Sequence, residues 1–170
     1  LEPWRNGENW GNWMPMVEQF RAGIGELLGV SSRAICPQIN ISSGLTKIIH
    51  ALPKKAGRDV IVLSRQDFPT IGFVVKMAER AGYRLHFIDG SPTDVTAWEA
   101  AINQSTAIVH ITHALSDSSH LLPVADITAL TNAAGAMSIV DIAQSLCAVP
   151  TPVADWDPDF VLGTGVKFLC

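Results

Sequence analysis

The sequence has 170 residues, of which 48% are hydrophobic and 16% are charged, and its formal net charge at pH 7 is −4. That length suffices for one substantial hydrophobic core, and a small acidic charge without a basic tract argues against a nucleic-acid or anionic-membrane partner. No apolar run approaches the roughly 18 residues of a membrane span, and the first residues lack the pattern of a secretory signal. We therefore expect a globular, cytoplasmic protein whose low charge content reflects surface hidden against a partner subunit or further chain.

The cysteines argue against covalent or metal crosslinks. Cys36, Cys147 and Cys170 are widely spaced and form no CxxC motif, so we expect neither a disulfide framework nor a zinc site, and no other metal. The first two are interpreted as small core residues.

The N-terminal region, residues 1–30, is predicted to be an aromatic arm followed by a helix. Trp4, Trp10 and Trp13 stand among Asn and Gly without a regular period. Apolar residues then recur at helical spacing over 16–28, and Gly29 fits as the stop of that helix. The sequence does not decide whether the aromatics cap a pocket or only pack on the surface.

Residues 31–170 alternate between short β-branched runs and helical stretches. The predicted strands cover 39–41, 60–63, 85–88, 107–111, 137–140 and 160–162, and the predicted helices cover 45–52, 70–81, 96–102 and 124–133. This alternation is typical of right-handed βαβ units. We predict an α/β fold, a three-layer sandwich with a mostly parallel sheet, and its ligand site at the carboxyl ends of the strands.

A small-residue turn follows the first predicted strand. A glycine turn at a helix N-terminus presents free backbone N–H groups, which suit a phosphate, and two hydroxyls could add hydrogen bonds. An ordinary helix cap is the alternative. The candidate phosphate-binding residues are Ser43, Gly44, Leu45 and Thr46.

Two further candidates follow later strands. Phe68 comes after the strand at 60–63, where an aromatic ring could lie flat on a cofactor or simply fill the core. Asp141 ends the strand at 137–140 and is interpreted either as a helix N-cap or as a carboxylate aimed at a ligand. A carboxylate that holds a pyridine nitrogen protonated needs a desolvated site, and Gln144 could reach the phenolic oxygen of the same ring.

The last strand ends in a glycine-rich turn that delivers Lys167. Its neighbours Val166 and Phe168 are apolar, so we expect apolar surroundings that lower the pKa of the amine and make it nucleophilic. A lysine that merely extends to solvent is the alternative. A lysine and an aspartate at the ends of buried strands are what pyridoxal 5'-phosphate (PLP) requires, and the chain order of phosphate turn, aromatic, aspartate and lysine favours that cofactor.

The segments that carry these candidates resemble the motifs of fold-type I PLP enzymes of the class V aminotransferase group, which includes kynureninases and cysteine desulfurases. The resembling segments are 43–47, 67–70, 112–113, 141–145 and 164–170. The resemblance implies the N-terminal portion of a PLP-binding large domain over 31–170, which stops just after the lysine. It also implies an amino-acid substrate and a homodimer.

The resemblance assigns a role to each site residue. Lys167 would form the Schiff base, Asp141 would bind the pyridine nitrogen, and Gln144 would lie near the phenolic oxygen. Phe68 would stack on the ring, and Thr164 lies in the segment that carries the lysine. The implied activity is transamination or lysis at Cα or Cβ.

Three positions depart from the family pattern and leave the reaction open. Val166 stands where relatives have His or Tyr, Ile71 stands where kynureninases have Asp, and Gln144 is the residue that desulfurases favour where kynureninases favour His. The alternatives are a cysteine desulfurase or selenocysteine lyase, a non-catalytic relative, and a phosphate-binding α/β module.

Overall fold

A computed structural model describes residues 5–7 and 10–169, so Trp4 and Cys170 lie outside the described residues, as does the side chain of Trp10. The chain forms two compact units, Leu1–Gln38 and Ile39–Cys170, and each is described by itself. The predicted division after residue 30 remains a prediction.

The first unit contains one long helix, α2 (Trp10–Leu28), which begins six residues earlier than the sequence predicts and includes part of the expected arm. Gly29 has a φ of 67°, and the Val30 N–H bonds back to the Gly25 carbonyl at 2.8 Å. This left-handed stop agrees with the predicted helix end. The short helix η1 (Ser32–Ala34) follows. No helix within the described ranges is long and apolar enough to cross a membrane.

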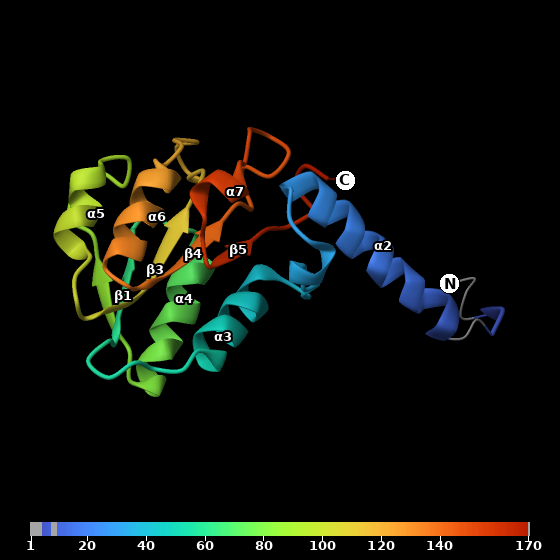
Figure 1. Ribbon diagram of the computed structural model, residues 1–170, viewed down its shortest axis with the longest axis horizontal. Coiled ribbons are helices and arrows are strands. Elements are labelled where there is room, and N and C mark those ends of the chain that lie inside the picture. Colours follow the sequence, from blue (N-terminus) through green and yellow to red (C-terminus); the bar gives the residue numbers. More distant parts are fainter. Residues whose placement is uncertain (1–4, 8–9, 170) are drawn as a thin grey trace. The chain divides into compact units, whose positions relative to one another are not determined.

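The second unit is built on a five-stranded parallel sheet in the order β2-β1-β3-β4-β5 (Figure 1). The predicted parallel α/β sheet is confirmed, and five of the six predicted strands are present to within two residues at either end. The strands are β1 (Val60–Leu63), β2 (Arg84–Phe87), β3 (Thr106–Thr112), β4 (Met137–Asp141) and β5 (Phe160–Leu162).

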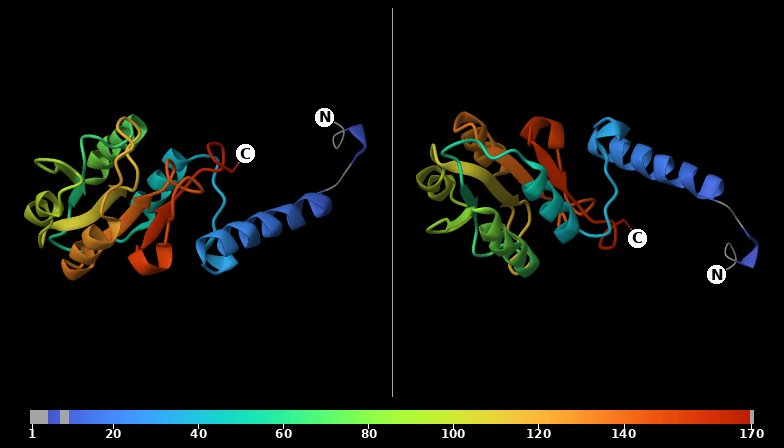
Figure 2. Two further views of the ribbon diagram at one scale, coloured as in Figure 1. Left: turned by 90° about the horizontal axis from the view of Figure 1, so that it is seen from above. Right: turned by 90° about the horizontal axis from the view of Figure 1, so that it is seen from below.

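Helices cover both faces of this sheet, which confirms the predicted three layers (Figure 2). One face carries α3 (Ile41–Ala51) and α4 (Pro69–Ala78), the latter extended by η2 (Glu79–Ala81); the other carries α5 (Val95–Ala101), α6 (Val124–Ala133) and α7 (Val153–Trp156). The core on the α3 and α4 side is formed by apolar residues of these helices and of the sheet, among them Leu45, Ile61, Ile71, Ile108, Ile139 and Leu162.

The strand predicted at 39–41 is wrong. Ile39 is 88% exposed, and α3 already begins at Ile41 because the Asn40 side chain caps it, accepting the Ser43 N–H at 2.8 Å. A side-chain cap that satisfies an otherwise unpaired N–H group fixes the helix start. This cap outweighs the β propensity of the two flanking isoleucines.

The cysteine interpretation is also wrong, because Cys36 and Cys147 are both exposed. Cys147 lies in the turns after β4 and has a φ of 64°, a conformation that belongs to surface turns rather than to a packed strand or helix.

Hydrogen bonds between Asp159 and Ser138 hold β5 against β4. The Asp159 carboxylate accepts the Ser138 N–H at 2.8 Å, and the Asp159 N–H donates to the Ser138 hydroxyl at 3.0 Å. The resulting register pairs Leu162 with Asp141. The lysine-bearing segment after β5 therefore leaves the sheet at the same edge as Asp141.

Candidate active site

The carboxyl edge of the sheet gathers the polar residues that follow the strands. Because all five strands are parallel, the segments after β1, β3, β4 and β5 meet there. The chain moves outward from β1 to β2 and then returns to the other side of β1 with β3. The gap between β1 and β3 is thus the topological switch point, where open α/β sheets bind ligands.

Phe68 and Lys167 meet at this edge although they are far apart in the sequence. The Lys167 Nζ lies 5.6 Å from the centroid of the Phe68 ring, and Phe68 is 43% exposed at the N-cap position of α4. Val166 is 84% exposed and Phe168 47% exposed. The expected apolar enclosure of the lysine is therefore wrong within the described residues, because its flanking side chains point to solvent and one aromatic ring faces the amine.

Asp141 is the buried carboxylate of the site. It is 4% exposed, and its Oδ1 accepts the Ala143 N–H at 2.8 Å. It caps no helix, since turns follow it. Burial raises its pKa above 3.8, and the charge of His110, the Ala143 N–H and the charge of Lys167 oppose that rise. The structure thus brings Phe68, Asp141 and Lys167 together.

A hydrogen-bonded group that the sequence did not predict lies beside Asp141. The Asp67 carboxylate accepts the Thr112 hydroxyl at 2.6 Å and the Ser64 N–H at 3.2 Å, and it lies 3.2 Å from the His110 Nδ1. The side chains of His110 and Asp67 are 0% and 2% exposed. The sequence feature that could have indicated this group is His110, a histidine within the otherwise apolar run of β3.

His113 follows β3 on the opposite face of the sheet from His110. Its ring makes an edge-on contact with Trp156, with centroids 4.6 Å apart. Burial lowers the pKa of His113, and no partner for its Nδ1 occurs among the described residues. The ring packs against α7 through Trp156, and its Nδ1 is available for a hydrogen bond.

The predicted phosphate turn lies in the first turns of α3. The Ser43 N–H, expected to be free, is taken by Asn40, and the Thr46 hydroxyl donates to the Ser42 carbonyl at 2.8 Å. Gly44 and Leu45 are buried, so the Leu45 side chain belongs to the core and only its backbone could meet a ligand. The phosphate-binding role of this turn remains a prediction.

Gln144 and Thr164 are half-buried and follow β4 and β5 at the same edge. Their cofactor contacts also remain predictions.

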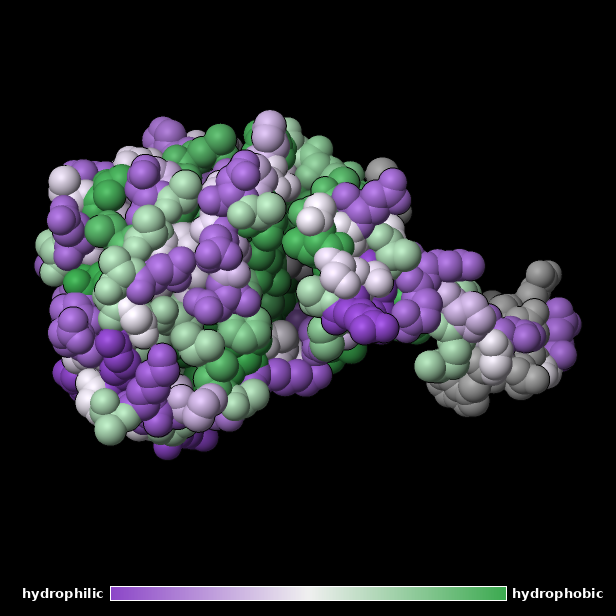
Figure 3. Space-filling model, viewed as in Figure 1, coloured by the Kyte–Doolittle hydropathy of each residue, from purple (hydrophilic) through white to green (hydrophobic). Residues whose placement is uncertain are grey.

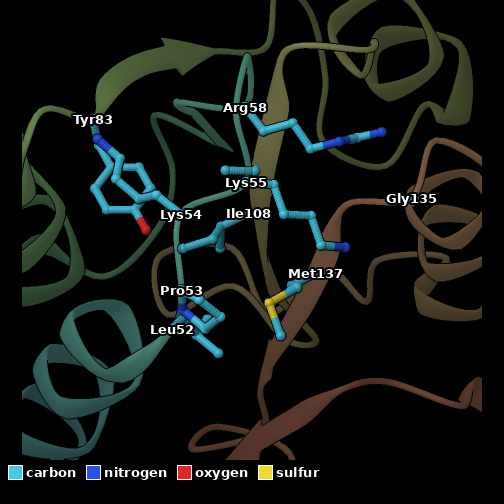
Figure 4. Close-up of a pocket in the computed structure, with 10 residues that line it drawn as sticks. Leu52, Pro53, Lys54, Lys55, Arg58, Tyr83, Ile108, Gly135 and Met137 are labelled. Atoms are coloured by element: carbon cyan, nitrogen blue, oxygen red, sulfur yellow. The ribbon is translucent and has the colours of Figure 1, made fainter.

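A shallow pocket at the opposite, amino edge of the sheet is a different feature (Figure 4). Two of its cations are already engaged: Lys54 donates to the carbonyls of Ala81 and Gly82 at 2.9 and 2.7 Å, and Arg58 donates to those of Thr106 and Ala134 at 2.9 and 2.7 Å. These donors satisfy backbone carbonyl groups at the ends of η2 and α6 and at the start of β3. A third cation, Lys55, also lines the pocket. The predicted site residues that follow the strands, Asp141 and Lys167 among them, lie at the other edge.

Comparison with known proteins gives one family. The model of the family "Aminotransferase class-V" matches residues 8–170. The kynureninase of Pseudomonas fluorescens is 28% identical over 99% of this chain and 42% of its own length. The kynureninase of Deinococcus radiodurans is 25% identical over 97% and 40%, and the cysteine desulfurase of Gluconacetobacter diazotrophicus is 29% identical over 72% and 32%. The chain spans less than half the length of these relatives.

Solved structures share the fold. The apo cysteine desulfurase from Thermococcus onnurineus NA1 has a TM-score of 0.77 at 22% identity over 88% of this chain and 38% of its own. A NifS-like protein has a TM-score of 0.83 at 17% identity over 95% and 46%. The cystine C–S lyase C-DES, whose structure contains cysteine persulfide, has a TM-score of 0.81 at 22% identity over 89% and 42%. In another C-DES structure, glycine is covalently linked to the PLP cofactor.

Proposed function

The chain belongs to the aminotransferase class-V family, and on that premise we propose that the protein is a PLP-dependent enzyme that acts on an amino acid. The observation that carries this proposal is the meeting of the Lys167 amine with the Phe68 ring, at 5.6 Å from its centroid, beside the buried Asp141. The homodimer and the cytoplasmic location remain predictions.

The residues present fit PLP chemically. Its pyridine ring needs a flat apolar face, which the half-exposed Phe68 offers. Its ring nitrogen needs a desolvated carboxylate, which Asp141 supplies, and its aldehyde needs a lysine amine, which Lys167 supplies. His113 adds an Nδ1 without a partner among the described residues.

The proposed mechanism assigns one task to each of these side chains. When bound, PLP supplies an electron sink for the bond that breaks at the substrate Cα. Lys167 would hold the cofactor through its amine and would move a proton at the substrate Cα. Asp141 holds a proton at the pyridine nitrogen, and Phe68 orients the ring plane. Gln144 and Thr164 would contact the cofactor, and the α3 turn of Ser43–Thr46 would hold its phosphate.

Covalent trapping tests the proposal. Full-length protein is incubated with PLP, reduced with borohydride and digested, and the modified peptide is identified by mass spectrometry. We expect the label on Lys167 and its loss in Lys167→Ala. Lys76→Ala is the matched control, because Lys76 is an exposed lysine of α4 that pairs with Glu79, and it should retain the label.

Two results would contradict the assignment. A label on Lys47, Lys54, Lys55 or Lys76 would show that another amine binds the cofactor. Wild-type protein that takes up no PLP at saturating cofactor would instead indicate a non-catalytic relative, which the exposed Val166 at the position of a phosphate-binding His or Tyr would then explain.

The second candidate is a C–S lyase of the cysteine desulfurase type. Gln144, half-buried after β4, is the residue that the resemblance associates with desulfurases, and one such relative is 29% identical. Incubation of the PLP-loaded protein with cysteine and, separately, with kynurenine separates the candidates. Sulfur release from cysteine alone supports the lyase, and cleavage of kynurenine alone excludes it.

A further inference from the structure

The side chains of His110 and Asp141 lie on the same face of the sheet. Side chains alternate along a strand, so His110 and Thr112 of β3 point to one face, the face that Ile108 shares with the α3 and α4 core. On β4, Ile139 pairs with His110 and Asp141 pairs with Thr112. The His110 imidazole and the Asp141 carboxylate are therefore on neighbouring strands and the same side of the sheet, offset by two residues.

Asp67 fixes the orientation of this imidazole. Its carboxylate is held by the Thr112 hydroxyl and the Ser64 N–H, and it faces the His110 Nδ1 at 3.2 Å. A carboxylate can only accept, so Nδ1 carries a proton. The Nε2 is buried and has no partner among the described residues.

The carboxyl groups at this edge favour a nearby cation. Two buried carboxylates would be strongly unfavourable without one. Burial lowers the pKa of His110, but the charge and hydrogen bond of Asp67 and the charge of Asp141 raise it by more, so it lies above 6.5. Lys167 also lowers the pKa of Asp141 through its charge, whereas the charge of Asp67 raises it.

We propose that His110 is a positioning residue: its positive charge, fixed by Asp67 on the same face of the sheet as Asp141, keeps Asp141 ionised toward the pyridine nitrogen of the cofactor. His110 touches neither cofactor nor substrate in this role and acts only through Asp141. The inference rests on the proposed function for its purpose, but the charge state of the pair is a property of the protein without cofactor.

NMR titration of full-length, cofactor-free protein tests the charge state. Carboxyl-labelled aspartate and nitrogen-labelled histidine are followed in wild type, in His110→Asn and in His86→Asn. Asparagine at position 110 can still donate toward Asp67 but carries no charge. We expect the proton affinity of Asp141 to rise roughly tenfold in His110→Asn, as the loss of a nearby opposite charge predicts. His86 is exposed on β2, and its variant should leave Asp141 unchanged.

PLP affinity at pH 7, measured from the cofactor absorbance, is the second readout. We expect a weaker affinity in His110→Asn, by at most the roughly tenfold change in the proton affinity of Asp141. An unchanged Asp141 titration in that variant would overturn the inference, whatever the affinity. If the variant does not fold, wild type decides alone: a neutral His110 ring at pH 7 overturns the inference, and an imidazolium supports it. Failure of wild type to bind PLP would refute the proposed function, whereas the titration would still test the pair.

Discussion

At the scale of single residues, Asp67 connects more of the candidate site than any motif indicates. It joins the end of β1 to two residues of β3 through Thr112 and His110, and its own turn closes through the Ser64 N–H. Each bond reaches a carboxylate whose side chain is 2% exposed. Hydrogen bonds to a buried charge stabilise more than neutral ones.

We expect Asp67→Asn to destabilise the protein by about 2–4 kcal/mol, because it leaves the buried His110 without its counter-charge. Urea unfolding measures this change, and Asp117→Asn, at an exposed residue, should stay within about 0.5 kcal/mol of wild type.

The pKa of His110 lies above 6.5 in the folded protein. Its proton therefore stabilises the fold fully below pH 6.5, and this part is lost as the pH rises through the folded-state pKa. The deficit of Asp67→Asn should shrink over that range, and a deficit that grows there would contradict the charge assignment.

The sequence could predict which residues carry chemistry but not this network. Asp141 and Lys167 each follow a recognisable buried strand. His110 and Asp67 become partners only because β1 and β3 are neighbours in the sheet, and strand order is a long-range property that local patterns do not contain. The exposure of Val166 and Phe168 is likewise a matter of tertiary packing.

At the scale of elements, prediction succeeded where burial dominates. The ranges 60–63, 124–133 and 160–162 match β1, α6 and β5, because each is an apolar or periodic run whose ends are marked by polar or small residues. The four-residue α7 was missed because one turn contains too few residues to show a period. The strand at 39–41 failed because one side-chain hydrogen bond decides the local structure.

That hydrogen bond gives a prediction for α3. We expect Asn40→Ala to cost about 1 kcal/mol, because the Ser43 N–H loses its acceptor at the start of the helix. Thermal unfolding measures the loss, and His50→Ala, at an exposed position in the last turn of the same helix, should change stability by a few tenths of that amount. Equal stability of Asn40→Ala and wild type would mean that another group caps the helix.

At the scale of the whole molecule, the sheet of the second unit has two edges with different chemistry. The carboxyl edge holds Asp67, Asp141 and Lys167. At the amino edge, carbonyl groups accept the donors of Arg58 and Lys54, and Lys55 lies beside them. Over the face of this unit drawn in Figure 3, hydrophilic and hydrophobic residues are interspersed, so the surface in that view does not single out either edge. The distinction comes from the strand direction and from which polar groups remain available.

This difference between the two edges predicts which backbone amide signals will shift when PLP binds. On addition of PLP to full-length protein, backbone amide signals of Phe68, His113, Asp141 and Lys167 should shift, because the ends of parallel strands at a switch point share one ligand environment. The amides of Arg58 and Gly135, at the amino edge, should stay within the noise of the spectrum. Inorganic phosphate at the same concentration is the control, and it should perturb at most the start of α3. Shifts confined to Arg58 and Gly135 would place the ligand in the amino-edge pocket of Figure 4. In that case the parallel sheet would be a shared scaffold without the expected site, since the residues that line that pocket include lysines but no carboxylate that could hold a pyridine nitrogen as Asp141 is proposed to do.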